Sequence, residues 1–219
     1  MENRCLPLWH ETIMKMTNFT DGLKSPGLTE LISRYDAWRS RWTAVTGNES
    51  SWGAAELLDG RLWIRDGYPY PDWKAKVIEP CEVGYLVLSA TTERSNSPRT
   101  AIESMFSNLE DAGKYVIVNL GDMVRRKRNI EPLYRKWQRS GLYSDLTKEP
   151  VDEPVVQFIA DYNGVEDDLV RQFIHKYSLR ERPDRYAYLT PADEPKSRIL
   201  VESYDALDEV LTEGLERSE

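Results

Sequence analysis

Residues 84–142 read GYLVLSATTERSNSPRTAIESMFSNLEDAGKYVIVNLGDMVRRKRNIEPLYRKWQRSGL, and this stretch decides the fold class. It begins with an apolar run over 85–89 that predicts a strand. Pro98 is suited to the start of a helix. Apolar residues follow it at helical spacing: Ala101, Ile102, Met105, Phe106 and Leu109. We therefore expect a strand and then a helix that ends near Gly113.

The second half of this stretch combines an ambiguous apolar run with dense positive charge. The β-branched residues of 115–118 favour a strand, whereas the spacing of the apolar residues continues a helix. We expect a helix, with the basic residues 125–128 near its C-terminal end, where cations complement the helix dipole. A further short helix is predicted over 132–141, where a glycine would end it.

The sequence on either side supplies further elements. An amphipathic pattern predicts a helix over 28–42, and extended segments are predicted over 60–65 and 74–79, on either side of a loop that two prolines stiffen. Residues 149–154 have the composition of a linker. The remaining predicted elements are strands over 155–160, 186–189 and 198–202 and helices over 165–177 and 203–215.

These elements predict an α+β fold. We expect a single domain over residues 25–219, with a mainly antiparallel sheet of about five to six strands flanked by helices. The chain has 219 residues, of which 40% are apolar, and this is enough to bury one sizeable core. Residues 1–24 are expected to form a flexible N-terminal extension.

The charge of the chain is negative but uneven. The formal net charge is −8, which argues against a general nucleic-acid-binding protein because such proteins are normally basic. Residues 124–148 nevertheless contain eight Lys or Arg and two acids, whereas residues 149–219 contain eighteen acids and eight Lys or Arg. A basic middle followed by an acidic region indicates either an internal electrostatic match or a charged partner.

Cysteine usage and hydropathy predict the compartment. The two cysteines, Cys5 and Cys81, form neither a CxxC pair nor a disulfide framework. The sequence contains no apolar run of about 18 residues, and its first residues lack the apolar segment of a signal peptide. We therefore expect a cytoplasmic protein.

The sequence contains no pattern of catalytic residues. Its two histidines, His10 and His175, lie in no motif, and GxSxG, HExxH, Walker and GxGxxG patterns are absent. The acids of 166–168 are expected at the start of a helix, where acids serve the helix dipole more often than a metal ion. The sequence therefore predicts a protein that is not an enzyme and that uses no cofactor or metal.

Two groups of residues are candidates for contact with a partner. Exposed Tyr and Trp are favoured anchors of interfaces, and the loop over 68–73 carries three of them: Tyr68, Tyr70 and Trp73. This loop would either contact a partner or cap the core. The second group interleaves basic and aromatic residues: Arg125, Arg126, Arg128, Tyr134 and Trp137. It is interpreted as a charged helix end matched by the acidic C-terminal region, as a protein interface or as a nucleic-acid surface.

Five segments carry a resemblance to a known family. They are RLWIRDG at 61–67, GYLVLSATTERS at 84–95, AIESMFSNLEDAGKY at 101–115, KYVIVNLGDMVR at 114–125 and RILVESYDALDEVL at 198–211. Their order and some of their local sequence resemble the immunity factors that neutralise the tuberculosis necrotizing toxin, an actinobacterial NAD glycohydrolase. The resemblance contains no catalytic signature.

The resemblance implies an immunity protein, or antitoxin. Such a protein would bind a cognate toxin domain, here an NAD glycohydrolase, in a stoichiometric complex and block its active site without catalysis of its own. Electrostatic complementarity would speed capture and exclude wrong partners. Relative to the family pattern, this chain has three apparent additions: residues 1–25, the basic run with the helix that follows it, and residues 165–177.

The alternative function is that of a nucleic-acid-binding regulatory or phage-related protein that uses the basic segment 125–139. The acidic total charge disfavours this function. A third possibility is an enzyme with an unrecognised carboxylate site, but no pair of acids is distinguishable from solvated helix faces.

Overall fold

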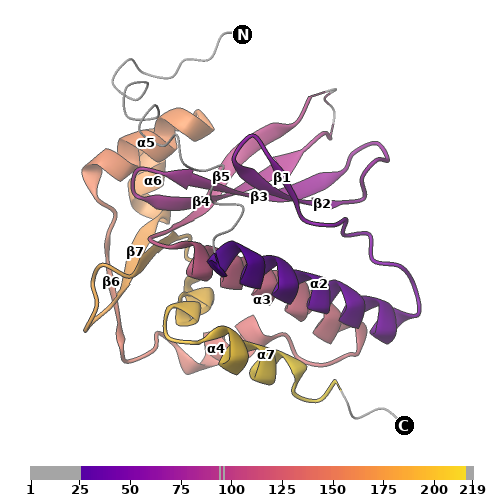
Figure 1. Ribbon diagram of the computed structural model, residues 1–219. Coiled ribbons are helices and arrows are strands. Elements are labelled where there is room, and N and C mark those ends of the chain that lie inside the picture. The colour runs from indigo at the N-terminus through magenta and orange to yellow at the C-terminus, as the bar shows by residue number, and fades with distance from the viewer. Residues whose placement is uncertain (1–25, 94, 96, 216–219) are drawn as a thin grey trace.

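The computed structural model of this chain describes residues 26–93, 95 and 97–215, and the predicted N-terminal extension lies outside them. Figure 1 shows how the elements are arranged. In chain order they are α2 (Pro26–Thr46), β1 (Glu56–Leu58), β2 (Arg61–Asp66), β3 (Lys74–Cys81), β4 (Gly84–Thr91), β5 (Arg99–Phe106), α3 (Leu109–Lys127), α4 (Leu133–Ser140), β6 (Leu146–Pro150), α5 (Glu153–Asn163), α6 (Asp167–Phe173), β7 (His175–Leu179), β8 (Tyr186–Leu189), the 3₁₀ helix η3 (Glu194–Leu200) and α7 (Tyr204–Thr212). None of the helices in the described part of the chain has the length and apolarity that a bilayer crossing requires.

The strands of the described residues form one antiparallel sheet in the order β1-β2-β3-β4-β5-β8-β7-β6. The first five strands pair with their neighbours along the chain. β8 pairs with β5, so that the late strands β7 and β6 extend the sheet on that side. The α+β class is therefore confirmed, but the sheet has eight strands, more than the sequence predicted.

The predicted helix over 98–113 is wrong in its first half, which forms β5. β5 pairs with β4 across a bulge that leaves Glu103 as an extra residue. Ile102 and Met105 consequently pack into the same core although they lie three positions apart. This spacing imitates the period of a helix, and the helix itself begins only after β5, as α3.

The predicted strand over 155–160 is also wrong, because these residues lie in helix α5. Pro154 occupies the first turn of the helix, where its missing N–H costs nothing. Gly164 ends the helix in the left-handed conformation, with φ of 64°. These two boundary signals outweigh the strand preference of the valines between them.

Three further boundaries differ from prediction. The helix predicted over 165–177 ends at Phe173, and β7 follows it. The linker predicted over 149–154 begins inside β6, which pairs with β7. The strand predicted over 198–202 falls largely within the 3₁₀ helix η3. β6 and β7 are distant in sequence, so their pairing leaves no local signal for periodicity to detect.

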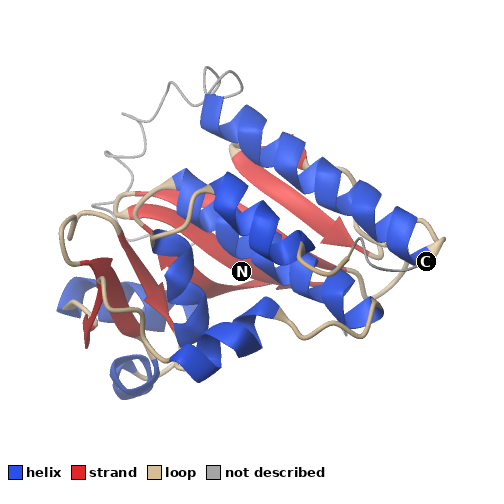
Figure 2. Ribbon diagram, turned by 90° about the horizontal axis from the view of Figure 1, so that it is seen from below, coloured by secondary structure: helices blue, strands red, loops and turns tan. Residues whose placement is uncertain are grey.

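Helices cover both faces of the sheet, and Figure 2 shows several of them lying across one face. On this face α2, α3 and α7 pack against inward residues of the strands such as Leu62 and Ile64. On the opposite face α5 and α6 pack against the alternate residues, such as Val77 and Leu88. Because successive side chains of a strand point to opposite faces, the central strands contribute to two cores.

Helix α3 packs against the sheet and against the helices α2 and α7, and the helix predicted over 115–118 is confirmed. Thirteen of its residues are buried, so it is enclosed rather than amphipathic. Two glycines allow neighbouring side chains to approach its backbone. A Cβ atom at Gly121 would lie 2.8 Å from Leu211, and one at Gly113 would overlap Tyr204 and Leu31.

The N-terminal half of α3 carries two buried charges that hold the segments after β7. Asp111 accepts two hydrogen bonds from the Arg185 guanidinium, at 2.8 and 2.6 Å. The Lys114 ammonium is fully buried and lies 2.7 Å from the Glu202 carbonyl, 2.7 Å from Asp111 and 2.9 Å from Glu110. These three acceptors satisfy its three donors.

The C-terminal half of α3 carries two more buried charges that cap other helices. The Asp122 carboxylate accepts hydrogen bonds from the backbone N–H groups of Leu133 and Tyr134, at the N-terminus of α4. The Arg125 guanidinium donates to one carbonyl just before α4 and to three carbonyls at the end of α7. Its acceptors are the carbonyls of Glu131 at 2.8 Å, Val210 at 3.3 Å, and Leu211 and Glu213 at 2.9 Å each.

We predict that Arg125→Met lowers the free energy of unfolding by about 3 kcal/mol, because it keeps a similar chain length but leaves buried carbonyls without donors. Urea denaturation followed by circular dichroism measures this loss. The matched control is Arg128→Met, which removes an exposed guanidinium and should change stability by less than about 0.5 kcal/mol. Equal stability of the two variants would contradict the capping role.

Candidate partner-binding surface

Strand β2 places an aromatic and a basic side chain on the sheet face that bears α5 and α6. Leu62 and Ile64 are buried against the opposite helices. Strand alternation therefore directs Trp63 and Arg65 to the other face, where Trp63 packs against the second core. Both residues remain half-buried.

The Arg65 guanidinium lies among three aromatic rings. Its central carbon is 5.2 Å from the ring centroid of Trp63, 4.9 Å from that of Tyr68 and 5.7 Å from that of Trp73. One nitrogen also forms an ion pair with Glu56 at 2.5 Å. Cation–π attraction holds such rings around a guanidinium. Arg65 therefore organises the aromatic residues at this end of the sheet.

The rings also contact one another. Trp73 meets Trp63 edge-on at a centroid distance of 6.4 Å and Tyr68 at 5.8 Å. Edge-to-face pairs of this kind are favourable beyond the area they bury. The cluster of Trp63, Arg65, Tyr68 and Trp73 thus connects the turn to the strands below it.

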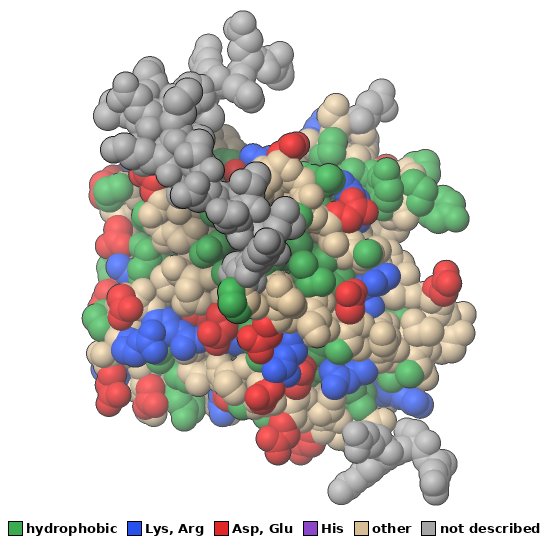
Figure 3. Space-filling model, in the orientation of Figure 1, with side chains coloured by type: hydrophobic (Ala, Val, Ile, Leu, Met, Phe, Trp, Pro, Cys, Tyr) green, Lys and Arg blue, Asp and Glu red, His purple; other side chains and the backbone are tan. Residues whose placement is uncertain are grey.

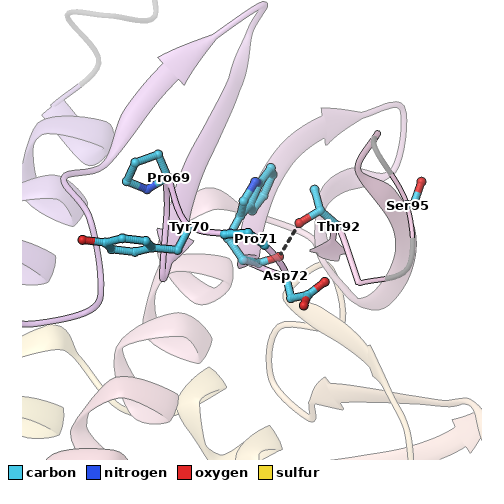
Figure 4. Close-up of a pocket in the computed structure, with 7 residues that line it drawn as sticks. Pro69, Tyr70, Pro71, Asp72, Thr92 and Ser95 are labelled. Carbon is cyan, nitrogen blue, oxygen red and sulfur yellow. Dashed lines mark hydrogen bonds between the residues drawn. The ribbon is translucent and has the colours of Figure 1, made fainter.

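Residues 68–73 form the turn between β2 and β3, which we call the aromatic turn. Gly67 precedes it with φ of 77° and donates its N–H to the Ser51 carbonyl at 2.9 Å. The Trp73 carbonyl accepts from the Thr92 N–H at 3.1 Å and from its hydroxyl at 3.4 Å, and Figure 4 marks a bond between these residues. Hydrogen bonds at both ends therefore fix the turn to neighbouring segments.

Two aromatic side chains of the turn are open to solvent. Tyr68 is 55% exposed and Tyr70 is 74% exposed, whereas Trp73 is half-buried. Figure 3 shows hydrophobic side chains gathered at the right of the view, over this turn. The turn was interpreted either as a cap on the core or as a partner contact. Trp73 covers the core, and Tyr70 faces outward, where a partner could reach it.

A shallow pocket of about 430 Å³ adjoins the turn (Figure 4). It lies between the aromatic turn and the loop after β4. Its lining residues are Pro69, Tyr70, Pro71, Asp72, Trp73, Thr92 and Ser95. A protruding ring beside an open depression is a shape that a protein surface can cover.

The second candidate group is divided between the core and the surface. Arg125 is 1% exposed and Trp137 is 4% exposed, so the prediction that these two side chains contact a partner is wrong. Arg125 caps helix ends, and Trp137 packs in the larger core. Arg126 and Arg128 are exposed, and Tyr134 is half-buried. In the basic run, therefore, one arginine stabilises the fold and the other basic residues are exposed to solvent.

Two other basic residues of this region are matched by acids. Lys136 pairs with Glu213 at 2.8 Å, and Arg139 donates to Glu131 at 2.7 Å. The hydrogen bond from Arg139 lowers the pKa of the Glu131 carboxyl below its ordinary value. The expected match with the acidic C-terminal region is therefore present for Lys136, although both pairs are exposed and contribute little stability.

A polar cluster on the α3 side of the sheet was not singled out by the sequence. The Tyr115 hydroxyl donates to Glu103 at 2.8 Å, and Lys76 pairs with the same carboxylate. Lys196 lies 4.8 Å from the Tyr115 ring centroid and pairs with Asp193 at 2.7 Å. Burial, followed by the charges of both acids, raises the pKa of Tyr115 well above its ordinary value. The phenol therefore stays protonated, and lysines balance both acids.

Comparison with known proteins identifies a similar fold. Rv3902c from M. tuberculosis has a solved structure that matches with a TM-score of 0.51 and 14% sequence identity, over 80% of this chain and 86% of that chain. At this identity the similarity concerns the fold alone. No protein family model and no curated protein matches the chain.

We predict that mutation distinguishes the exposed Tyr70 from Trp73, which packs against the core. Tyr70→Ala should change the free energy of unfolding by less than about 0.5 kcal/mol, because the ring is exposed. Trp73→Ala should cost about 2 kcal/mol, because it removes packing from the second core and from Arg65. Urea denaturation of both variants measures the difference. A loss for Tyr70→Ala as large as that for Trp73→Ala would show that the Tyr70 ring serves the fold.

Proposed function

We propose that this protein is an immunity protein of the cytoplasm that binds a cognate toxin domain stoichiometrically and blocks its active site. The partner is proposed to be an NAD glycohydrolase of the necrotizing toxin type. Steric occlusion requires a fixed surface with strong anchors and no catalytic residue. The aromatic turn provides such a surface.

The exposure of Tyr68 and Tyr70 on a fixed turn is the observation that carries this proposal. Tyr combines a large apolar ring with a polar tip, and its two side-chain torsions make it inexpensive to order on binding. The Arg65 guanidinium contacts the Tyr68 ring, and the Thr92 N–H donates to the Trp73 carbonyl, so both ends of the turn are held. A preorganised surface of this kind loses little conformational entropy when it meets a partner.

A resemblance in the sequence also supports the proposal. The segments 61–67, 84–95, 101–125 and 198–211 resemble the immunity factors in sequence and order. Part of the resemblance, RLWIRDG at 61–67, lies on the strand that supports the aromatic turn.

The nucleic-acid-binding function receives less support. Of the aromatic residues in the basic segment, Trp137 is buried, and the Tyr134 ring is flanked by the guanidiniums of Arg126 and Arg135. A base needs an open ring on which to stack. The basic segment therefore offers charge without a stacking surface.

Co-expression with a toxin tests the proposal. An NAD glycohydrolase domain of the necrotizing toxin type is produced in bacteria with and without this chain, and growth and cellular NAD are measured. We expect the chain to restore both and to copurify with the toxin in a 1:1 complex. Loss of NAD in the presence of the chain, with no complex on size-exclusion chromatography, would contradict the proposal.

Variants locate the contact. Tyr70→Ala should weaken the purified complex by about 10-fold to 100-fold, since truncated aromatic anchors cost this much at interfaces. The matched control is Phe173→Ala on α6, which removes a ring that is 49% exposed elsewhere on the molecule. Isothermal titration calorimetry compares the two. Equal affinity of both variants would place the contact outside the aromatic turn.

A further inference from the structure

We propose that four basic residues form a second contact surface that binds an acidic surface of a protein partner. They are Arg126, Lys127, Arg128 and Arg135, which we call the basic end. For the toxin as partner this inference rests on the proposed function, and it adds the charge that the partner must present.

The basic end places four positive charges at the surface. All four residues are exposed, and within the described residues none of them forms an ion pair, in contrast to the neighbouring Lys136 and Arg139. The chain as a whole carries a net charge of −8. This cluster is positive although the chain as a whole is negative. It is therefore complementary in charge to an acidic patch on a partner.

Three of the four cations lie against aromatic rings. The Arg126 guanidinium lies 5.7 Å from the Tyr134 ring centroid and that of Arg135 lies 6.0 Å from it. The nitrogen of Lys127 lies 5.7 Å from the Trp42 ring centroid. Contacts of this kind restrict long side chains that would otherwise be freely mobile. The charges of α3 and α4 are therefore partly ordered by rings of α2 and α4.

The fold also fixes the backbone beneath these charges. Arg125 binds the ends of two other segments, and the N–H groups that follow it close the end of α3. The residues of the basic end can therefore meet a partner without refolding of the helix.

An acidic protein surface fits the basic end better than a nucleic acid does. Single strands are bound by a groove of cations together with open aromatic faces, and the rings here are already occupied by the cations of the chain. A long polyanion would also meet the negative remainder of the surface. A folded partner with one acidic patch avoids both difficulties.

The basic end and the aromatic turn lie toward the same end of the molecule. Figure 1 shows the C-terminal end of α2 and the turn between β2 and β3 on the same side of the view, at the right. A partner that spans this side of the molecule, from one sheet face to the other, would contact both, with rings as anchors and cations to steer its approach.

The first arm of the test needs no toxin. Fluorescent oligo-glutamate and oligo-dT of equal charge are titrated with the whole chain, with R126Q/R128Q, and with the matched control R180Q/R182Q, which removes two exposed arginines near the β7–β8 turn. We expect oligo-glutamate to bind, R126Q/R128Q to weaken this binding by about 10-fold, and the control to change it by less than about 2-fold. Tighter binding of oligo-dT than of oligo-glutamate, equal loss in both variants, or no binding of oligo-glutamate would overturn the proposal.

The second arm uses the toxin domain. The association rate of R126Q/R128Q should fall by about 10-fold at low salt and should depend less on salt, while the dissociation rate changes little. An unchanged association rate would overturn this inference but leave the immunity function intact. Failure of the unmodified chain to bind the toxin would instead reject the proposed function, while the peptide arm still decides on the basic end.

Discussion

The burial of four acidic and basic side chains along one helix is the constraint on which the rest of this structure depends. Asp111, Lys114, Asp122 and Arg125 are each 2% exposed or less. A buried charge without a partner costs several kcal/mol, so each must meet fixed donors or acceptors. Most of those partners are backbone groups at the ends of other segments. The position of α3 therefore determines where α4, α7 and the hairpin of β7 and β8 can lie.

This constraint also explains how one basic run serves two purposes. Successive residues of a helix point in directions about 100° apart, so neighbours in sequence face different surroundings. Arg125 points into the molecule and caps α7, whereas Arg126 and Arg128 point into solvent. The aromatic turn, at the ends of β2 and β3, is divided in the same way, because Trp73 anchors the turn while Tyr70 is exposed. In the basic run and in the aromatic turn, the side chains proposed to contact a partner are those that the core does not bury.

The sequence predicted those parts of the fold that have local signals. The helices over 28–42 and 132–141 and the strand over 85–89 carry clear periodicity or capping, and all are present. β5 was missed because its bulge gives Ile102 and Met105 helical spacing. In the candidate site the loop of Tyr70 could be recognised by composition. The burial of Arg125 could not, because its acceptors come from segments far along the chain.

Hydrogen exchange of the toxin complex tests whether the partner lies on the aromatic turn and the basic end, and whether the fold stays unchanged on binding. We expect slowed exchange on binding at amides of 66–73, of 92, 93 and 95, and of 126–135, with unchanged slow exchange in the buried part of α3. Protection confined to α5 and α6, with none at the turn, would contradict it.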